Sequence, residues 1–279
     1  MIKEEDVLRF LKDRFTGISP NNDGIHKRYE NHVKTEHSKP LLEGILPHLS
    51  KKSKILDIGS GWGSFVYLLN EKGYEASGVE IQDFMVDYAR QRLMNLGNLK
   101  NKPEAVYLKV SALDLPFSDS HFDVITLWDV LEHIEDYEKV LHEAIRVLKP
   151  KGKIFIKNVN YASCFMEPHY RVPWLPFLPK KIAVKYLQLL GRDPLYIQNG
   201  IFYISNSNIL RVLKNKNLHI TTLQIEKILS SMPQIRSPLK RLIYNVSGFF
   251  GAKHILVFIL KAIQKNPFSS SVDIMAVKK

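Results

Sequence analysis

The residues best placed to do chemistry form a glycine-rich turn after a short apolar segment. The segment spans residues 55–58 and contains one acidic side chain, Asp57, and the turn contains Gly59, Gly61 and Gly63. Glycines let a ligand approach the backbone closely, and the helix that starts after the turn offers free N–H groups. Two phosphate-binding signatures do not fit, because a serine stands where G-x-G-x-x-G requires its third glycine and no G-K-[ST] follows.

Two carboxylates narrow the kind of ligand that this turn would bind. Asp57 places a negative charge just before the turn, which would repel a pyrophosphate and attract a cationic amino-acid group. Glu80 ends the next apolar segment, where a carboxylate can accept hydrogen bonds from both hydroxyls of a ribose. Ile81 beside it can lie on an adenine ring. The sequence therefore predicts a site for an adenosine that carries a positive, phosphate-free tail.

The predicted strands must lie next to one another in a sheet in order to position these residues. Segments of strand character lie at 55–58, 75–79, 105–110, 122–127, 153–159, 219–228 and 272–277. Amphipathic helical spacing separates the first five segments, and Asp83 is a candidate cap for one of the helices. This alternation predicts an α/β fold with a doubly wound, mostly parallel seven-stranded sheet and helices on both faces.

The regular alternation stops after the fifth strand. Residues 160–204 are rich in proline and aromatic side chains, which is typical of an inserted cap, and Ser205 can begin the next helix. Residues 229–269 hold a second, apolar helical insertion. We therefore predict an N-terminal helical segment on the substrate side, residues 1–40, followed by a main domain, residues 41–279, that carries both insertions.

Three further stretches, together with the glycine turn, point to a known family. Residues 111–134 are similar to the family's segment between the adenine loop and the fourth strand, residues 148–153 to its turn before the fifth strand, and residues 272–277 to its last, antiparallel strand. On these motifs the chain resembles the class I S-adenosylmethionine-dependent methyltransferases, most closely over residues 50–160. The resemblance implies a Rossmann-like methyltransferase fold, S-adenosylmethionine as cofactor and S-adenosylhomocysteine as product.

The resemblance also implies a role for each residue that matches the family's motifs. Nine residues would contact the cofactor: Asp57, Gly59 and Gly61 beside the methionine part, Glu80 at the ribose, Ile81 on the adenine face, Ser111, Ala112 and Leu113 along the adenine edge, and Trp128 near the transferred methyl group. The family usually has an aspartate where this chain has Ser111. A serine hydroxyl can still bind the adenine amine, but without the charge-assisted bond.

Methyl transfer from a sulfonium needs an aligned acceptor and, for many acceptors, a base. His133 and His169 are the candidate catalytic residues, because an imidazole titrates near neutral pH, and Asp129 is a third proton acceptor. His133 is equally well explained as a structural residue. The metal-assisted O-methyltransferases of quinone synthesis have a cluster of acidic residues and histidine that resembles Asp129, Glu132 and His133. Metal-free relatives share this cluster, and we therefore predict no metal.

Several acceptor classes are disfavoured by the sequence. The fourth strand ends in residues 127–130 (LWDV) and not in the N/D-P-P-Y/F string of the amino methyltransferases, and Cys164 lacks the proline that precedes the nucleophile of cytosine C5 enzymes. Small molecules, glycans and lipids remain. The stretch 167–174, which contains His169, follows the fifth strand, where this family inserts substrate-binding elements.

The charge distribution predicts an anionic partner. Residues 151–279 carry 20 Lys and Arg against 4 Asp and Glu, whereas residues 1–150 carry 20 against 24. Such a basic half suits a phosphate-bearing acceptor, an acidic membrane face or RNA, although lysines that merely solvate a surface explain it equally. Residues 242–263 combine a long apolar face with lysines, which is typical of an interfacial helix pair or of a helical insertion buried on the sheet.

These observations lead to one main functional prediction. The single cysteine, Cys164, suits a reducing compartment, and no secretory signal or apolar run of membrane-spanning length occurs in the 279 residues, so we expect a cytoplasmic protein with peripheral membrane contact through its basic half. We predict a methyltransferase that acts at an oxygen of a small-molecule, glycan or lipid-linked acceptor. The alternatives are an RNA-directed methyltransferase, with nucleic acid the less favoured partner, and a non-catalytic protein that binds S-adenosylmethionine.

Overall fold

The structure is a computed structural model that describes residues 1–18, 23–96, 101–216, 218–221 and 271–279. The predicted insertion at 229–269, which includes residues 242–263, lies outside the described residues. The strands are β1 Lys54–Ile58, β2 Glu75–Glu80, β3 Tyr107–Lys109, β4 Phe122–Trp128, β5 Leu148–Val159, β6 Met166–Glu167, β7 Val172–Pro173, β8 Leu218–Thr221 and β9 Ser271–Lys278.

The helices fall between and around these strands. The α-helices are α1 Glu4–Phe15, α2 Asp23–Arg28, α3 Ser38–Ile45, α4 Ser64–Glu71, α5 Asp83–Met94, α6 Pro103–Val106, α7 Tyr137–Val147, α8 Lys180–Leu189, α9 Leu195–Asn199 and α10 Asn206–Asn215. The described part of the chain also contains a π-helix, η1 Tyr29–Val33, and three 3-10 helices, η2 Leu46–His48, η3 Leu131–His133 and η4 Leu175–Phe177.

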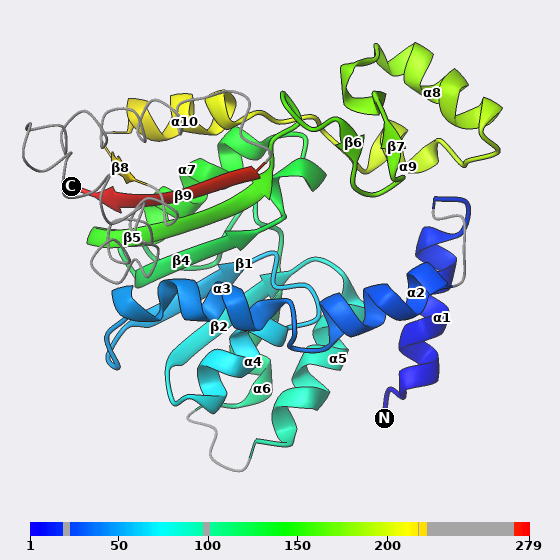
Figure 1. The fold of residues 1–279 in the computed structure, drawn as a ribbon. Coiled ribbons are helices and arrows are strands. Elements are labelled where there is room, and N and C mark those ends of the chain that lie inside the picture. The colour runs from blue at the N-terminus through cyan, green and yellow to red at the C-terminus, as the bar shows by residue number, and fades with distance from the viewer. Residues whose placement is uncertain (19–22, 97–100, 217, 222–270) are drawn as a thin grey trace, which may run out of the picture.

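One seven-stranded sheet forms the centre of the molecule (Figure 1). Its strand order is β3-β2-β1-β4-β5-β9-β8, and β1 to β5 pair in parallel while β9 runs antiparallel to both of its neighbours. The predicted doubly wound, mostly parallel sheet is therefore confirmed, including its antiparallel last strand. In such a sheet the chain reverses direction of winding between β1 and β4, and ligands bind beyond the carboxyl ends of the strands there.

Helices cover both faces of the sheet, because its strands are apolar on both sides. Leu56 and Ile125 pack under α7 and α10 on one face, whereas Ile55 and Val124 pack against α3, α4 and α5 on the other. Strand residues alternate between faces, so neighbours in the chain enter different cores. The buried sheet holds the carboxyl ends of β1, β2 and β4 at fixed positions.

Some local predictions are confirmed and one is wrong. Ser205 caps α10 as predicted, and its hydroxyl accepts a hydrogen bond from the backbone N–H of Asn208 at 3.2 Å. The third strand is shorter than predicted, because Pro103 begins the helical turn α6 just before it. Asp83 does not cap α5: it is the first residue inside that helix, and its carboxylate binds Lys109 Nζ at 2.6 Å.

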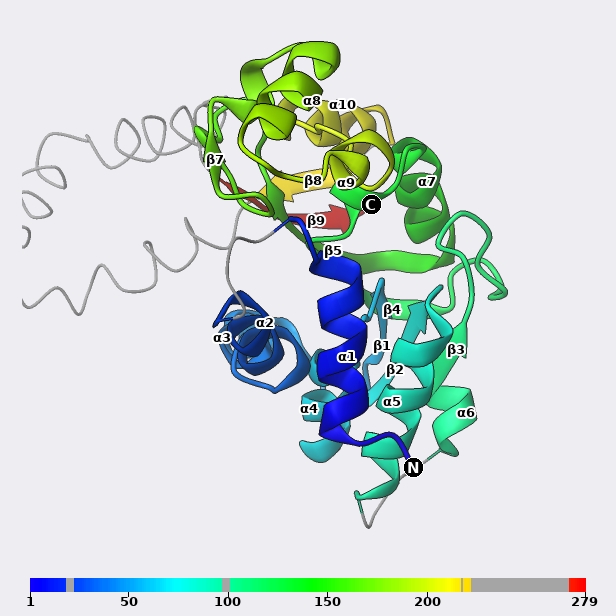
Figure 2. The ribbon, with the colours of Figure 1, turned by 90° about the vertical axis from the view of Figure 1, so that its right-hand side faces the viewer.

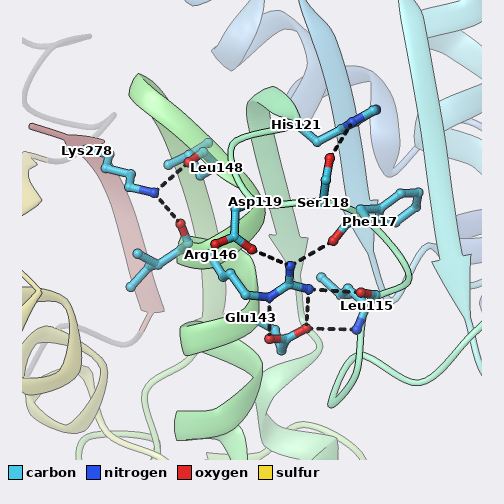
Figure 3. Close-up of polar contacts among 10 residues, drawn as sticks. Leu115, Phe117, Ser118, Asp119, His121, Glu143, Arg146, Leu148 and Lys278 are labelled. Atoms are coloured by element: carbon cyan, nitrogen blue, oxygen red, sulfur yellow. Dashed lines mark hydrogen bonds and ion pairs between the residues drawn. The ribbon is translucent and has the colours of Figure 1, made fainter.

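The segment that follows the adenine-edge residues is tied to α7 by Arg146 (Figure 3). Its guanidinium donates to the carbonyl oxygens of Leu115 and Phe117 at 2.9 and 2.8 Å and to Asp119 at 2.8 Å. Glu143 holds the guanidinium from the other side and accepts the backbone N–H of Leu115 at 2.9 Å. These contacts fix a loop that has no secondary structure of its own.

Two further parts of the chain lie beyond the carboxyl ends of the parallel strands (Figures 1 and 2). The N-terminal helix α1 packs Val7 and Leu11 against Trp62 of the glycine turn. Residues 160–204 form the β6–β7 hairpin with η4, α8 and α9, and they have a core of their own that includes Tyr170 and Leu187. We call this second part the cap.

Candidate functional site

The glycine turn adopts a backbone that only glycine accepts readily. Gly59, Gly61 and Gly63 have φ angles of +71°, +52° and +74°. The backbone N–H groups of Gly59 and Ser60 donate to the carbonyl oxygen of Val79 at 2.9 and 3.0 Å, which ties the turn to β2. A Cβ atom at Gly59 would lie 2.5 Å from Val130, whereas a Cβ at Gly61 would meet no protein atom within 4 Å. Gly61 therefore faces open space on the cavity side of the turn.

Glu80 lies directly opposite this turn at the end of β2. Its carboxylate accepts the backbone N–H of Gly61 at 3.0 Å through one oxygen, and those of Ile81 and Gln82 at 2.8 and 3.0 Å through the other. Backbone donors thus hold the carboxylate at the rim of the cavity. Each carboxylate oxygen has two lone pairs, so one acceptor site or more remains for the hydroxyls of a ribose.

We expect Glu80→Ala to weaken binding of S-adenosylhomocysteine by about 1–3 kcal/mol, because the ribose hydroxyls and the three N–H groups lose their acceptor. Titration calorimetry measures this change directly. Glu75→Ala is the matched control, since Glu75 begins the same strand and its side chain only approaches Lys54 Nζ at 3.9 Å. Equal affinities for the wild type and Glu80→Ala would remove Glu80 from the cofactor site.

Asp57 is buried at the carboxyl end of β1, next to Thr126 of β4. The Thr126 hydroxyl donates to its carboxylate at 2.5 Å, and the two residues are in register across the strands. Burial, with a smaller contribution from the charge of Glu80, raises the pKa of Asp57 to about 7, although the Thr126 bond opposes the shift. The carboxylate is therefore poorly compensated in its ionised form. A cationic group bound beside it would supply the missing charge.

The predicted adenine side of the cavity is apolar and open. Ile81 is 60% exposed although it is a large aliphatic side chain, and Ser111, Ala112 and Leu113 line the same cavity. The Ser111 hydroxyl accepts the backbone N–H of Leu113 at 3.2 Å, so its own hydrogen stays available as a donor. An exposed aliphatic surface beside a polar edge is the environment that a purine base requires.

Trp128 closes the inner wall at the end of β4. Its ring packs edge-on against Phe65, with 5.4 Å between the ring centroids, and its indole Nε1 is buried without a hydrogen-bond partner. A buried donor that lacks a partner indicates a ligand or water that is needed to complete the site. The open space at Gly61, the exposed Ile81 and the buried Asp57 fit the methionine, adenine and cationic parts of S-adenosylmethionine.

The far end of the same cavity contains the two predicted catalytic histidines. His133 and His169 lie with their ring centroids 5.2 Å apart, and both line the cavity of about 810 Å³ that also contains the nine predicted cofactor residues. His133 belongs to η3, immediately after β4, whereas His169 belongs to the cap. The structure thus brings together two residues that are 36 positions apart in the sequence.

His169 is held by a buried carboxylate that the sequence analysis did not single out. Its Nδ1 lies 2.7 Å from Glu167 Oε1, and Glu167 is fully buried. Glu167 also accepts the backbone N–H of Tyr170 at 2.6 Å and the hydroxyl of Tyr161 at 3.3 Å. The carboxylate of Glu167 can only accept a hydrogen bond, so Nδ1 of His169 carries the hydrogen. Nε2 of His169 is then left with a free lone pair.

His133 has a different environment. Its Nδ1 lies 2.8 Å from the carbonyl oxygen of Gly200, so Nδ1 donates and Nε2 is again the free nitrogen. Crowding by protein atoms, together with the neighbouring His169, lowers the pKa of His133 to about 4, although the side chain is still exposed along the cavity. His133 is therefore neutral at pH 7 but weakly basic.

Acidic residues near His133 do not form a metal site in the described part of the chain. Glu132 is buried, its Oε2 has no hydrogen-bond partner, and burial raises the pKa of its carboxyl group well above the usual value. Asp129, at φ +53°, lies 3.7 Å from His37 Nε2. Among the described residues, no three His, Cys, Asp or Glu side chains are grouped so that they could hold a metal ion.

Several cavity-lining residues were not predicted from the sequence. They come from the N-terminal segment and the cap, and they are Arg14, Phe15, Arg28, His32, His37 and Tyr196. Burial lowers the pKa of His32 to about 4, with His37 as the next cause. The two arginines carried no local signal in the sequence, because they resemble ordinary surface residues of amphipathic helices.

The central part of the chain is similar to known methyltransferases. Residues 56–156 match a family model described as a methyltransferase domain. The ubiquinone/menaquinone biosynthesis C-methyltransferase of Psychromonas ingrahamii is 32% identical over 145 residues, which cover 48% of this chain and 55% of that protein. The demethylmenaquinone methyltransferase of Tropheryma whipplei is 28% identical over 141 residues, which cover 50% of this chain and 54% of that one. The chain spans about half the length of the curated relatives it matches.

The fold is shared with a solved structure over nearly the whole chain. A methyltransferase from Thermotoga maritima, described as S-adenosylmethionine-dependent and as a possible histamine N-methyltransferase, has a TM-score of 0.50 and 18% identity, covering 97% of this chain and 99% of that one. The sheet order and the glycine turn define a Rossmann-like methyltransferase domain. Residues 56–156 therefore carry a methyltransferase domain, and the fold around this domain is the one found in an S-adenosylmethionine-dependent methyltransferase. Within its described residues, no helix has the length and apolarity to cross a bilayer.

Proposed function

We propose that this protein transfers the methyl group of S-adenosylmethionine to an oxygen of a small or lipid-linked anionic metabolite. One observation carries the proposal: a single cavity of about 810 Å³ is lined both by the cofactor residues and by His133, His169 and two arginines. When bound, the cofactor supplies an activated methyl group on a positively charged sulfur. The remaining tasks are to orient the acceptor, to exclude water and to accept a proton.

His169 is the better candidate for the base. Its Nε2 is free, the buried Glu167 fixes the ring, and that carboxylate would balance the positive charge of the protonated imidazole. His133 has the same free nitrogen, but its low pKa makes it a weak proton acceptor. A deprotonated phenol or other hydroxyl is nucleophilic at oxygen, and a phenolate is also nucleophilic at the ring carbons ortho and para to that oxygen. The relative from Psychromonas ingrahamii is described as a C-methyltransferase, so carbon is the competing acceptor atom.

The proposal is tested with isotopically labelled S-adenosylmethionine and a cell extract. The extract is separated into small-molecule, lipid, glycan and RNA fractions, and the labelled product is identified by mass spectrometry and by the carbon chemical shift of its methyl group. Label in a small-molecule or lipid fraction, on oxygen, is the expected result. A methyl group on carbon would correct the acceptor atom, label in RNA would establish the RNA-directed alternative, and tight cofactor binding without turnover would indicate a non-catalytic binding protein.

We also propose that the cytoplasmic protein contacts an anionic membrane peripherally, through the cap. Phe165, Trp174 and Phe177 are each about half exposed and lie in ring contact with one another, and the exposed Lys181 follows closely along the chain. Exposed aromatic rings followed along the chain by an exposed lysine suit the interface of an anionic bilayer.

Vesicles of phosphatidylglycerol should therefore shift the fluorescence of Trp174 to shorter wavelength, whereas neutral phosphatidylcholine vesicles should not. Trp174→Phe should remove the shift, and Met94→Ala, which changes an exposed apolar residue on α5, should not. An equal shift in Trp174→Phe would contradict membrane contact at the cap. Association of two copies of the chain without lipid would also contradict it, because the patch would then serve a protein interface.

A further inference from the structure

Two arginines extend into the acceptor end of the cavity from the N-terminal segment. Arg14 lies near the end of α1 and Arg28 is the last residue of α2, and both line the cavity that contains His133 and His169. The helices that carry them are far in sequence from the motif that binds the cofactor. Their position requires an explanation, because the cofactor end of the cavity needs a negative charge and not a positive one.

Arg28 is held in place but is not neutralised. Its guanidinium stacks on the Phe15 ring, 4.1 Å from the centroid, and one nitrogen donates to the carbonyl oxygen of His169 at 3.3 Å. Within the described residues, no carboxylate lies within ion-pair distance of it. Burial, and the charge of Arg171 to a lesser extent, lower the pKa of Arg28 despite opposing effects of Tyr196 and Glu167. A half-buried guanidinium has five N–H donors, and most of these have no acceptor here.

Most acidic groups around the cavity are committed to other contacts or to the cofactor end, and Glu135, which also lines the cavity, forms no ion pair with either arginine among the described residues. Glu167 binds His169 and the Tyr170 backbone, and Asp129 lies near His37. Glu132 is buried with a raised pKa, which favours its neutral form. Asp57 and Glu80 belong to the cofactor end. The charge of the two arginines is therefore available to a ligand.

The contacts also define the shape of that ligand. Phe15 and Tyr196 flank the arginines, and the Tyr196 ring lies 5.4 Å from the His169 ring, centroid to centroid. A guanidinium fork binds planar carboxylates and phosphates through paired hydrogen bonds, and aromatic walls favour an aromatic or apolar body. Because Arg28 is bonded to the backbone of the proposed base, an anionic group on Arg28 would lie close to that base.

We propose that Arg14 and Arg28 form an oxyanion subsite that selects acceptors carrying a carboxylate or a phosphate group, and orients them with a hydroxyl toward His169. This inference rests on the proposed function, since it assigns the acceptor end of the same cavity. It identifies the N-terminal segment as a determinant of acceptor specificity.

The subsite is tested by binding, without any turnover. Protein saturated with S-adenosylhomocysteine is titrated by calorimetry with three probes: 4-hydroxybenzoate, phenyl phosphate and the uncharged methyl 4-hydroxybenzoate. We expect one of the two anions to bind about tenfold more tightly than the ester, or better. The preferred anion distinguishes a carboxylate acceptor from a phosphate one. Equal or weaker binding of both anions would overturn the subsite.

Matched variants complete the test. Arg28→Gln and Arg14→Gln should each reduce anion affinity by about tenfold and leave affinity for S-adenosylhomocysteine unchanged. The controls Lys27→Gln and Arg9→Gln remove the same charge from the same two helices, at exposed positions outside the cavity. Unchanged anion binding in both arginine variants would refute the inference.

Product formation from the labelled extract separates the two hypotheses. A wild-type protein that binds the anions but labels no fraction would refute the proposed function and leave the subsite standing. Labelling with an unchanged KM for the acceptor in Arg28→Gln would refute the subsite and leave the function standing.

Discussion

His169→Ala should lower kcat by about 10²-fold or more, because the acceptor hydroxyl would then lose its proton to water and not to a positioned imidazole. The KM for S-adenosylmethionine should stay the same, since His169 lies at the acceptor end of the cavity. Steady-state kinetics with the acceptor identified from the extract measures both quantities. His142→Ala is the matched control, because His142 is an exposed histidine of α7 outside the cavity.

The role of Glu167 can be separated from that of His169. In Glu167→Gln, the amide NH₂ must face either the Tyr170 N–H or the His169 Nδ1–H, so one of the bonds at 2.6 and 2.7 Å is lost along with the charge. We expect kcat to fall by about tenfold or more, with an altered pH profile of kcat, because the ring loses its fixed tautomer. A purely structural Glu167 would change the thermal midpoint and leave the pH profile intact.

His133 provides the decisive comparison. Its pKa of about 4 keeps it neutral throughout the physiological range, and its bond to the Gly200 carbonyl ties η3 to the cap. We therefore expect His133→Ala to cost less in kcat than His169→Ala. The opposite order would assign the proton transfer to His133, and wild-type rates in both variants would show that the reaction needs neither base.

That the candidate cofactor residues lie together could be predicted from the sequence, because these residues belong to local motifs. Asp57 and Glu80 end adjacent strands, and the parallel pairing of β1 with β2 brings the ends of these strands together. A glycine pattern likewise specifies its own turn. To predict each of these features, one needs only the hydrophobic periodicity of strand, turn and helix and the rule that ligands bind at the carboxyl ends of parallel strands.

The acceptor half depends on contacts that no local pattern encodes. Arg28 reaches the backbone of His169 across 141 positions, and its selection among the 40 Lys and Arg residues depends on how α2 packs against the cap. Glu167 is only two residues from His169, but a proline-rich segment of irregular structure gives no periodicity from which its burial could be inferred. The helical turn α6 before β3 was also not predicted, because the apolar residues of this turn fit a strand as well as a helix.

Gly61→Ala should reduce binding of S-adenosylhomocysteine by about tenfold or more, equivalent to at least ~1.4 kcal/mol. The added methyl group would clash with no protein atom, because nothing lies within 4 Å of that position, but it would project into the space where the ligand approaches the turn. The φ of +52° at position 61 also imposes a conformational cost of about 1–2 kcal/mol on any residue with a Cβ.

The control variant Gly73→Ala measures the cost of placing a Cβ at a positive φ by itself. Gly73 has a φ of +78° and equally open surroundings, but it follows α4 at the opposite end from the glycine turn and lines no part of the cavity. Both variants should lose similar stability in thermal unfolding, and only Gly61→Ala should lose affinity in calorimetry. If the two variants bound S-adenosylhomocysteine equally well, the turn would not be in contact with the ligand. The cationic tail would then have to be bound by Asp57 without help from the turn.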